Sequence, residues 1–379
     1  MSVKKKICYI ISNLNTGGAE LSLKKIAIGL NNDFDFTVIS LSGNGIIGSS
    51  LKDHGINVII LNSLTIWDFF PKLILLYKNL KNLNPDIVHT WMYHSDFFGG
   101  IISKMAGIKI VYWNIRNTEI TNGTSLSTKF SAFLNIFLSY LLPTKIVLVS
   151  ESSKIYHSKI GYCKRKMIVI TNGYDSDSFK FNHEIRLDVR KKLLINESSI
   201  VIGSVGRFNK YKDHKTFIKA ALIILDEIND SVDLKFIIIG KDISIKNLEI
   251  YNLLINSKYI KNFILLTTKK DIVNYYFAFD IFCLHSISEG FPNVLAEAMA
   301  VGLPCVSTNV GDSKLMLNND TFIVLPKDII NLSKKLTKLI LLDPKQRKQI
   351  GEHNKSRILI NYSLDKLLND YRQIYKINN

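Results

Sequence analysis

Short apolar runs rich in Ile and Val alternate along the chain with longer stretches in which apolar residues recur at helical spacing. This alternation predicts parallel β-sheets whose strands are joined by crossover helices. The runs form two series, so we expect an α/β protein with two Rossmann-like, doubly wound parallel sheets in tandem. The predicted strands are 7–12, 36–41, 57–61, 87–90, 110–114, 145–149 and 167–170, then 200–205, 234–239, 263–266, 281–284, 305–307 and 322–325.

The pattern restarts near Asn172-Gly173-Tyr174-Asp175, a sequence suited to a turn. We therefore expect an N-terminal domain over 1–172 and a second domain over 173–355, because 379 residues are too many for one ordinary core. The sequence beyond 329 is helical, and we expect 356–379 to form a helix that returns to the first domain. Two such sheets would face a central cleft, with ligands beyond the carboxyl ends of the strands.

The composition is that of a folded protein, with 47% hydrophobic and 21% charged residues. The net charge of +17 favours anionic partners such as phosphorylated ligands, an acidic membrane or nucleic acid. Residues 1–180 hold 20 basic and 11 acidic residues and the remainder 29 and 21, so the excess is spread over both halves. A nucleic-acid-binding tail would concentrate the charge in one run.

Targeting and membrane-spanning segments are not predicted. The apolar run after Lys4, Lys5 and Lys6 is too short for a signal peptide, and glycines and charges follow it, so it is interpreted as a buried strand. The longest apolar stretch, 130–142, is too short to span a bilayer and ends at Pro143, which leaves a core or an interfacial helix. Aromatic and basic residues interleave at 67–81 and 129–140, as in core helices with a solvated edge or helices that lie on an anionic bilayer.

Cysteines, histidines and aspartates give no metal motif. The four cysteines lack CxxC spacing and are expected to be buried free thiols in a reducing compartment. None of the eight histidines has a metal-binding spacing, and His94, after a predicted strand, is either a structural or a site residue. Two DxD strings, at 33–35 and 175–177, lie in a turn and at the domain boundary, and no metal is expected there.

Two glycine-containing loops follow predicted strands. Gly17 and Gly18 stand at the start of a helical stretch, where bare backbone amides and the helix dipole favour a phosphate, although a plain turn explains them equally well. In the second domain Arg207 follows Gly206, and Lys212 comes shortly after. An Arg and a Lys at a strand's carboxyl end can neutralise a diphosphate, and the alternative is a solvated basic loop.

The segment 288–304, SEGFPNVLAEAMAVGLP, is the most informative. Pro292 is expected at the first helical position, which would leave the amides of residues 291–295 open to an anion. Glu289 lies in the loop and Glu297 about two turns up the helix, so they are expected to bind different parts of one extended ligand. The alternative is that Glu297 is an ordinary helix residue.

Together these motifs resemble glycosyltransferase family 4, the retaining enzymes of the two-domain GT-B fold. The resemblance covers nearly the whole chain and is carried by GGAE at 17–20, NGYD at 172–175, GRF and KDH within 206–214, and the 288–304 segment. It implies that Arg207 and Lys212 bind the donor diphosphate, that Glu289 faces the donor sugar and that Glu297 binds the ribose. It also implies donor-binding roles for Gly17 and Gly18 and for the helix-start residues Gly290, Phe291, Pro292, Asn293 and Val294.

The first domain would bind the acceptor, with His94 near the reacting centre and Arg116 on an anionic acceptor. Departures from the family pattern are Gly240-Lys241-Asp242, where a second glycine is frequent, Thr267, where Gly is common, and Arg116 itself, near a frequent His. These departures affect the expected nucleobase and acceptor contacts.

The expected function is retaining transfer of a hexose or N-acetylhexosamine from a nucleotide-diphosphate sugar, with UDP favoured, and no metal or cofactor is needed. The acceptor would be a glycan or a polyprenyl-diphosphate-linked glycan of bacterial surface polysaccharide, such as capsule or lipopolysaccharide. The protein would be cytoplasmic, at the inner face of the membrane, and would not bind nucleic acid. The alternatives are a nucleotide-sugar epimerase of the same fold and a module that binds anionic surfaces.

Overall fold

The computed structural model describes residues 4–62, 66–120, 123–229 and 231–376, and of residues 66–70 only the backbone. The chain forms two compact units, Met1–Asn172 with Asp365–Asn379, and Gly173–Leu364. The returning segment thus begins at Asp365, later than the expected residue 356. The reason is that helix α14 (Pro344–Asn361) stays with the second unit. A Cβ on its Gly351 would lie 1.9 Å from the Gly302 carbonyl oxygen, so α14 packs backbone to backbone on the end of helix α11 (Asn293–Val301).

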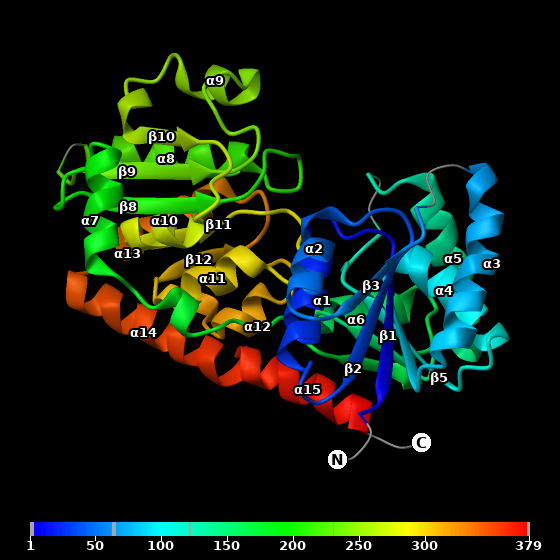
Figure 1. Ribbon diagram of the computed structural model, residues 1–379. Coiled ribbons are helices and arrows are strands. Elements are labelled where there is room, and N and C mark those ends of the chain that lie inside the picture. The colour runs from blue at the N-terminus through cyan, green and yellow to red at the C-terminus, as the bar shows by residue number, and fades with distance from the viewer. Residues whose placement is uncertain (1–3, 63–65, 121–122, 230, 377–379) are drawn as a thin grey trace. The chain divides into compact units, whose positions relative to one another are not determined.

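The N-terminal unit contains a seven-stranded parallel sheet in the order β3-β2-β1-β4-β5-β6-β7 (Figure 1). The strand order reverses between β1 and β4, which is where ligands bind in open sheets of this type. The strands are β1 (Lys6–Ile11), β2 (Asp35–Ser40), β3 (Asn57–Ile60), β4 (Ile87–Trp91), β5 (Ile110–Ile115), β6 (Lys145–Leu148) and β7 (Met167–Val169).

Helices cover both faces of this sheet because alternate strand residues point to opposite sides. Cys8 and Ile10 face a core formed with α3, α4 and α5. Tyr9, between them, faces α15. The helices of this unit are α1 (Gly18–Gly29), α2 (Gly45–Asp53), α3 (Ile66–Leu83), α4 (Tyr93–Met105), α5 (Leu126–Leu141), α6 (Glu151–Lys159) and α15 (Leu364–Lys376), with the 3-10 helix η1 (Lys164–Lys166).

Helix α15 completes the N-terminal unit through buried tyrosines. The hydroxyl of Tyr375 lies 2.8 Å from that of Tyr9 and 2.8 Å from His89 Nδ1. Tyr371 accepts a hydrogen bond from Asn114 Nδ2 at 2.8 Å, so strands β1, β4 and β5 are all bound to this helix. Burial lowers the pKa of His89 to about 3, helped by Arg116 nearby, so His89 is neutral. The last helix is therefore an integral layer of the unit that contains the N-terminus.

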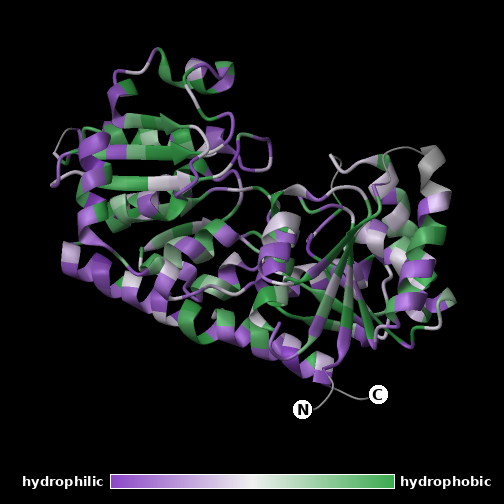
Figure 2. Cartoon of the chain, in the orientation of Figure 1, coloured by the Kyte–Doolittle hydropathy of each residue, from purple (hydrophilic) through white to green (hydrophobic). Residues whose placement is uncertain are grey.

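The second unit contains a six-stranded parallel sheet in the order β10-β9-β8-β11-β12-β13, and Figure 2 shows its strands as largely hydrophobic. Helices α8, α9 and α13 form a core on one face. The strands are β8 (Ile200–Val205), β9 (Leu234–Ile239), β10 (Phe263–Leu266), β11 (Ile281–Leu284), β12 (Cys305–Thr308) and β13 (Ile323–Val324). The remaining elements are α7 (His183–Lys192), α8 (His214–Ile228), α9 (Leu248–Leu254), α10 (Ile272–Ala278), α12 (Ser313–Leu317), α13 (Ile329–Leu341), η2 (Asp177–Phe179), η3 (Ile260–Asn262) and η4 (Asp320–Phe322).

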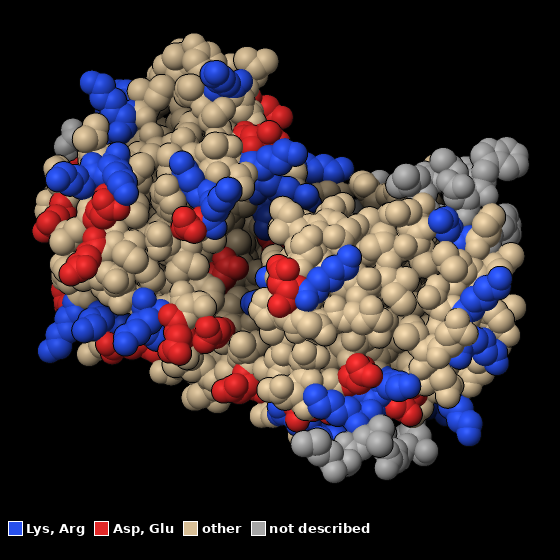
Figure 3. Space-filling model, in the orientation of Figure 1, with Lys and Arg blue, Asp and Glu red and all other residues tan. Residues whose placement is uncertain are grey.

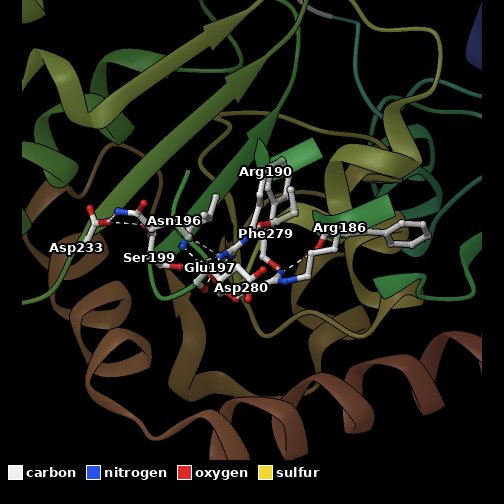
Figure 4. A network of polar contacts seen from close by, with 11 residues as sticks. Arg186, Arg190, Asn196, Glu197, Ser199, Asp233, Phe279 and Asp280 are labelled. Carbon is white, nitrogen blue, oxygen red and sulfur yellow. Dashed lines mark hydrogen bonds and ion pairs between the residues drawn. The ribbon is translucent and has the colours of Figure 1, made fainter. Parts of the chain in front are cut away.

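A network around Asp280 fixes the amino ends of two central strands of this sheet (Figure 4). Arg190, only 1% exposed, donates to Asp280 Oδ2 at 2.7 Å and to the Ala278 carbonyl. Arg186 donates to Asp280 Oδ1 at 2.6 Å, and the amide of Val201 donates to Oδ2. Helix α7 is thereby attached to the beginnings of β8 and β11, whose opposite ends carry the candidate site.

The fold predicted from the pattern is confirmed, and each predicted strand has ends within one residue of those observed. All four cysteines are buried and free. In the described part of the chain, no helix is both long and apolar enough to span a bilayer. Of the aromatic residues expected at 67–81, the side chains of Trp67, Phe69 and Phe70 lie outside the described residues.

Candidate functional site

The loops after β8 and β11 bring a cation and a carboxylate together at the carboxyl edge of the second sheet. Lys212 Nζ lies 2.5 Å from Glu289 Oε1, and Ser286 Oγ donates to the same oxygen at 2.5 Å. The Lys212 and Glu289 side chains are 20% and 14% exposed, so solvent screens this pair only partly. The amide of Ile287 donates to the Tyr211 carbonyl at 2.7 Å, which joins the two loops through their backbones. Both charged residues were predicted as site residues from the sequence, whereas the contact between them was not predicted.

His285, which sequence analysis did not single out, holds Lys212 in place. Its Nδ1 lies 2.5 Å from the Lys212 carbonyl oxygen and therefore donates, since a carbonyl can only accept. Its Nε2 then accepts from Ser204 Oγ at 2.6 Å. Burial, with His214 as a lesser cause, keeps the pKa of His285 well below its usual value, so the imidazole is neutral. In the sequence, the only indication that His285 belongs to the site is its position directly after a predicted strand.

Arg207 lies exposed at the carboxyl end of β8, beside the loop that follows β9. These two loops touch through backbone, because a Cβ on Gly240 would lie 2.1 Å from the Gly206 carbonyl oxygen. Asp242 has φ of +62°, a left-handed conformation that glycine adopts readily and aspartate tolerates. Asp242 therefore keeps the backbone turn where the family often has its second glycine.

The start of α11 differs by one residue from the expectation. The helix begins at Asn293, and Pro292 is its N-cap residue instead of the first helical residue. The Pro292 carbonyl accepts hydrogen bonds from the amides of Leu295 and Ala296, at 3.0 and 3.2 Å. The Leu295 amide is therefore used within the helix, which corrects its expected role as an open donor. The phosphate-binding role of residues 290–294 stays a prediction.

Gly311 and Tyr174 hold this helix start. A Cβ on Gly311, whose φ is +52°, would lie 2.2 Å from the Gly290 carbonyl oxygen, so the loop after β12 packs against the 288–292 loop. Tyr174 Oη donates to Asn293 Oδ1 at 2.6 Å, and its ring stacks on Phe291 with centroids 6.4 Å apart. The sequence indicated a turn at Tyr174 but gave no sign that it contacts the helix start.

Glu297 points from α11 toward a buried tyrosine. Tyr276 Oη donates to Glu297 Oε2 at 2.9 Å and lies 3.3 Å from the Val294 carbonyl oxygen. Tyr276 is fully buried, and its burial, with the Glu297 charge as a lesser cause, raises its pKa well above 10. The tyrosine therefore stays protonated and fixes one carboxylate oxygen. Glu289 and Glu297 have separate partners and do not form a carboxylate pair.

We expect Tyr276→Phe to weaken UDP binding about fivefold, because one hydrogen bond to a charged group is lost and the Glu297 carboxylate becomes free to rotate. Glu297→Ala should weaken it more, because it removes the carboxylate that is predicted to bind the ribose. Isothermal titration with UDP measures both effects. Tyr275→Phe, at the neighbouring half-buried position, is the matched control and should bind UDP normally. Unchanged affinity in both site variants would remove Glu297 from the nucleotide site.

The two glycines of the N-terminal unit lie at the start of a helix, as the sequence predicted. Gly17 is the N-cap residue and Gly18 the first residue of α1. A Cβ on Gly17 would lie 2.3 Å from Glu20 Oε2, whereas one on Gly18 would meet nothing within 4 Å. The Glu20 carboxyl thus lies against Gly17, and burial raises its pKa.

His94 is half-buried on α4 and lines a cavity of about 240 Å³. Lys72, Ser12, Ser42 and Phe98 contribute to the same cavity. Burial lowers the pKa of His94, so it can serve as a neutral acceptor or donor near neutral pH. The backbone two residues earlier is strained: Met92 has φ of 73° and ψ of 159°, a region that favours glycine.

Arg116 follows β5 and is bound within its own unit. Its guanidinium donates to Ser22 Oγ at 3.1 Å and to Asn172 Oδ1, and it lies 5.9 Å from the centre of the Trp91 ring. These contacts join the end of β5 to helix α1 and to Asn172, the last residue of the first segment of this unit. Both of these hydrogen bonds come from Nη2, and the acceptor-binding role of Arg116 stays a prediction.

The structure thus divides the predicted residues between the units. Gly17, Gly18, His94 and Arg116 belong to the first, and Arg207, Lys212, Glu289, the 290–294 segment and Glu297 to the second. The first aspartate of each DxD string has structural partners: Asp33 accepts from Arg372, and Asp175 accepts from the Asp177 amide and the Ser178 hydroxyl. Among the described residues, no group of three or more His, Cys, Asp or Glu side chains could hold a metal ion.

Known proteins match over the whole of this architecture. The family model "Glycosyl transferases group 1" matches residues 186–357, and "Glycosyltransferase Family 4" matches 16–178. The UDP-Gal:α-D-GlcNAc-diphosphoundecaprenol α-1,3-galactosyltransferase of Escherichia coli is 27% identical, covering 98% of this chain and 97% of its own. A Campylobacter jejuni α-1,4-N-acetyl-D-galactosaminyltransferase is 26% identical, covering 93% of each chain. The crystal structure of Anabaena Alr3699/HepE in complex with UDP superposes with a TM-score of 0.85 at 18% identity, covering 98% and 99%.

The protein is an enzyme that transfers glycosyl groups. This class is defined by the two parallel-sheet units, by the paired cation and carboxylate at the edge of the second sheet, and by these relatives. The chain belongs to glycosyltransferase family 4. Its characterised relatives are bacterial enzymes of capsule and lipid-linked oligosaccharide synthesis.

Proposed function

We propose that this glycosyltransferase moves a hexose or N-acetylhexosamine from a UDP-sugar to a polyprenyl-diphosphate-linked glycan, with retention of configuration and without a metal ion. The observation that carries the proposal is the contact between Lys212 Nζ and Glu289 Oε1. In this proposal the Lys212 ammonium would bind the donor diphosphate and the Glu289 carboxylate the donor sugar, at the edge of the sheet where ligands of such folds bind.

Four residues would supply the proposed chemistry. Arg207 and Lys212 would neutralise the negative charge that develops on the departing UDP, which is the role a metal ion plays elsewhere. Both hydrogen bonds to Glu289 end on Oε1, and Oε2 would accept from a hydroxyl of the donor sugar. Glu297 would accept from the ribose. The enzyme would act by charge stabilisation and by holding the acceptor hydroxyl close to the anomeric carbon.

The proposed substrates follow from the relatives. The Escherichia coli relative is named for UDP-galactose and a diphosphoundecaprenol-linked GlcNAc, and the Campylobacter jejuni relative for an undecaprenol-diphosphate glycan. We therefore propose the inner face of a bacterial membrane as the place of action, where such acceptors and cytoplasmic nucleotide-sugars meet. His94 and Arg116 are the proposed acceptor-side residues.

The test is to incubate the protein with labelled UDP-galactose, UDP-glucose, UDP-GlcNAc or UDP-GalNAc, each with and without GlcNAc-diphosphoundecaprenol. Label entering the lipid fraction, unaffected by EDTA, and an α linkage in the product support the proposal. Loss of activity with EDTA would contradict metal independence, and a β linkage would contradict retention. Conversion of the sugar nucleotide to its epimer without acceptor would replace the transferase proposal with the epimerase alternative.

A further inference from the structure

Helix α5 exposes most of its large apolar side chains, and only Ile136 and Leu138 among them pack half-buried against the core. The residues it buries are small or polar: Ser131, Ala132, Asn135 and Ser139. The residues it exposes are large and apolar, between 55% and 83% exposed: Leu126, Phe130, Phe133, Phe137, Tyr140 and Leu141. A helix on a protein surface in water normally shows the opposite arrangement. The outer face of α5 is therefore built for an apolar environment.

The inner face is held firmly despite its polarity. Asn135 Nδ2 donates to the Tyr93 carbonyl at 2.9 Å, and Tyr162 Oη donates to the Ala132 carbonyl at 2.9 Å. Ser139 Oγ accepts from the Cys163 amide at 2.9 Å. These bonds fix the rotation of α5 about its axis, so it cannot turn its apolar residues inward.

Basic residues border the apolar stripe. The bonds from Tyr162 and Cys163 place the following residues, Lys164 and Arg165, both exposed, beside the C-terminal half of α5. Lys166 Nζ donates to the Tyr140 carbonyl at 2.6 Å. The sequence of α5 itself contains one lysine and no acidic residue. The surface thus combines exposed aromatic rings with positive charge.

We propose that α5 is a membrane-docking surface, which lies on an anionic bilayer with Phe130, Phe133 and Phe137 in the interfacial region and Lys164 and Arg165 on lipid phosphates. A stripe of aromatic and aliphatic residues bordered by cations is what an interfacial helix requires. The charge favours a bilayer over a second copy of the chain, because two such faces brought together would oppose like charges. The stripe from residue 126 to 141 spans about 22 Å of helix, enough for several lipid headgroups.

This inference deepens the proposed function, because a lipid-linked acceptor is reached at a membrane surface. The experiment uses no donor and no acceptor, so its failure is distinguishable from failure of the transferase assay. The full-length protein is floated with vesicles of phosphatidylcholine alone and with vesicles that also contain phosphatidylglycerol. We expect binding to the anionic vesicles that weakens as salt increases.

The test variant is Phe130→Ser, Phe133→Ser, Phe137→Ser. The matched control is Leu194→Ser, Leu248→Ser, Leu341→Ser, which removes three apolar residues of the second unit that are even more exposed. Anionic-vesicle binding should fall about tenfold or more in the first variant and stay at the wild-type level in the second. An unchanged melting temperature without ligand shows that each variant is folded.

A second variant, Lys164→Glu, Arg165→Glu, should lose the preference for anionic vesicles while its melting temperature stays normal. Vesicle binding that survives in the triple phenylalanine variant would overturn the proposal. So would sedimentation showing that this variant converts a wild-type dimer to a monomer, because the apolar stripe would then bind a second copy.

Discussion

Lys212→Ala is expected to lower kcat by about 10²- to 10³-fold, the largest catalytic effect that we predict for a single residue. Two consequences add. The diphosphate loses the cation that would stabilise its developing charge, and Glu289, only 14% exposed, loses its ionic partner at the place where the donor diphosphate is proposed to bind. The measurement is the steady-state rate of sugar transfer over a range of donor concentrations.

Lys210→Ala is the matched control, because Lys210 is an exposed lysine in the same loop. Its kcat should stay within about threefold of the wild-type value. The pair of variants separates a site-specific cation from the general positive charge of the loop. Equal rate losses in the two variants, or a Lys212→Ala enzyme with normal kcat, would remove Lys212 from the reaction.

Arg190→Met is expected to destabilise the second unit by about 3 to 5 kcal/mol. Arg190 is almost completely buried, and its guanidinium donates to Asp280 and to the carbonyls of Ala278, Glu197 and Ser199. Methionine fills much of the volume but leaves these acceptors without their donor. Thermal denaturation should show a melting midpoint lowered by roughly 10 °C.

Lys192→Met provides the comparison, since Lys192 also lies on α7 and pairs with an aspartate, Asp188, but is well exposed. Its melting midpoint should equal that of the wild type, because exposed ion pairs contribute little. Arg190→Lys should fall between the two, since an ammonium cannot reach all the acceptors that the guanidinium fork does. A wild-type midpoint for Arg190→Met would show that the network in Figure 4 is not a stability determinant.

The strands were predictable from the sequence because buried parallel strands are continuous apolar runs, which differ plainly from helical periodicity. The runs at 200–205 and 234–239, for example, match β8 and β9 at both ends. The end of the second unit was not predictable, because α14 and α15 read as one continuous helical stretch. What assigns them to different units is a backbone contact at Gly351 and the tyrosines of α15, and both are tertiary features.

The candidate site was predictable as far as it depends on position after a strand. Arg207, Lys212 and Glu289 follow strand ends, where ligands of such sheets bind. Residues that only position a predicted site residue were not predictable. Tyr276, for example, lies on a helix well before Glu297 in the sequence, and only the fold brings its hydroxyl to the Glu297 carboxylate. For α5 the sequence left two alternatives open, a core helix and a helix that lies on an anionic bilayer, because its apolar residues are compatible with both.

The buried tyrosines of α15 have a consequence for the order in which the protein is made. Tyr371 and Tyr375 cover strands β1, β4 and β5, yet they are synthesised after the whole of the second unit. Nascent chains generally fold from the N-terminus onward, but here the first unit lacks a layer until the second unit has been synthesised. The second unit, which is continuous in sequence, can complete its fold earlier. A chain cut short before α15 would therefore leave the first unit, and not the second, with an exposed core.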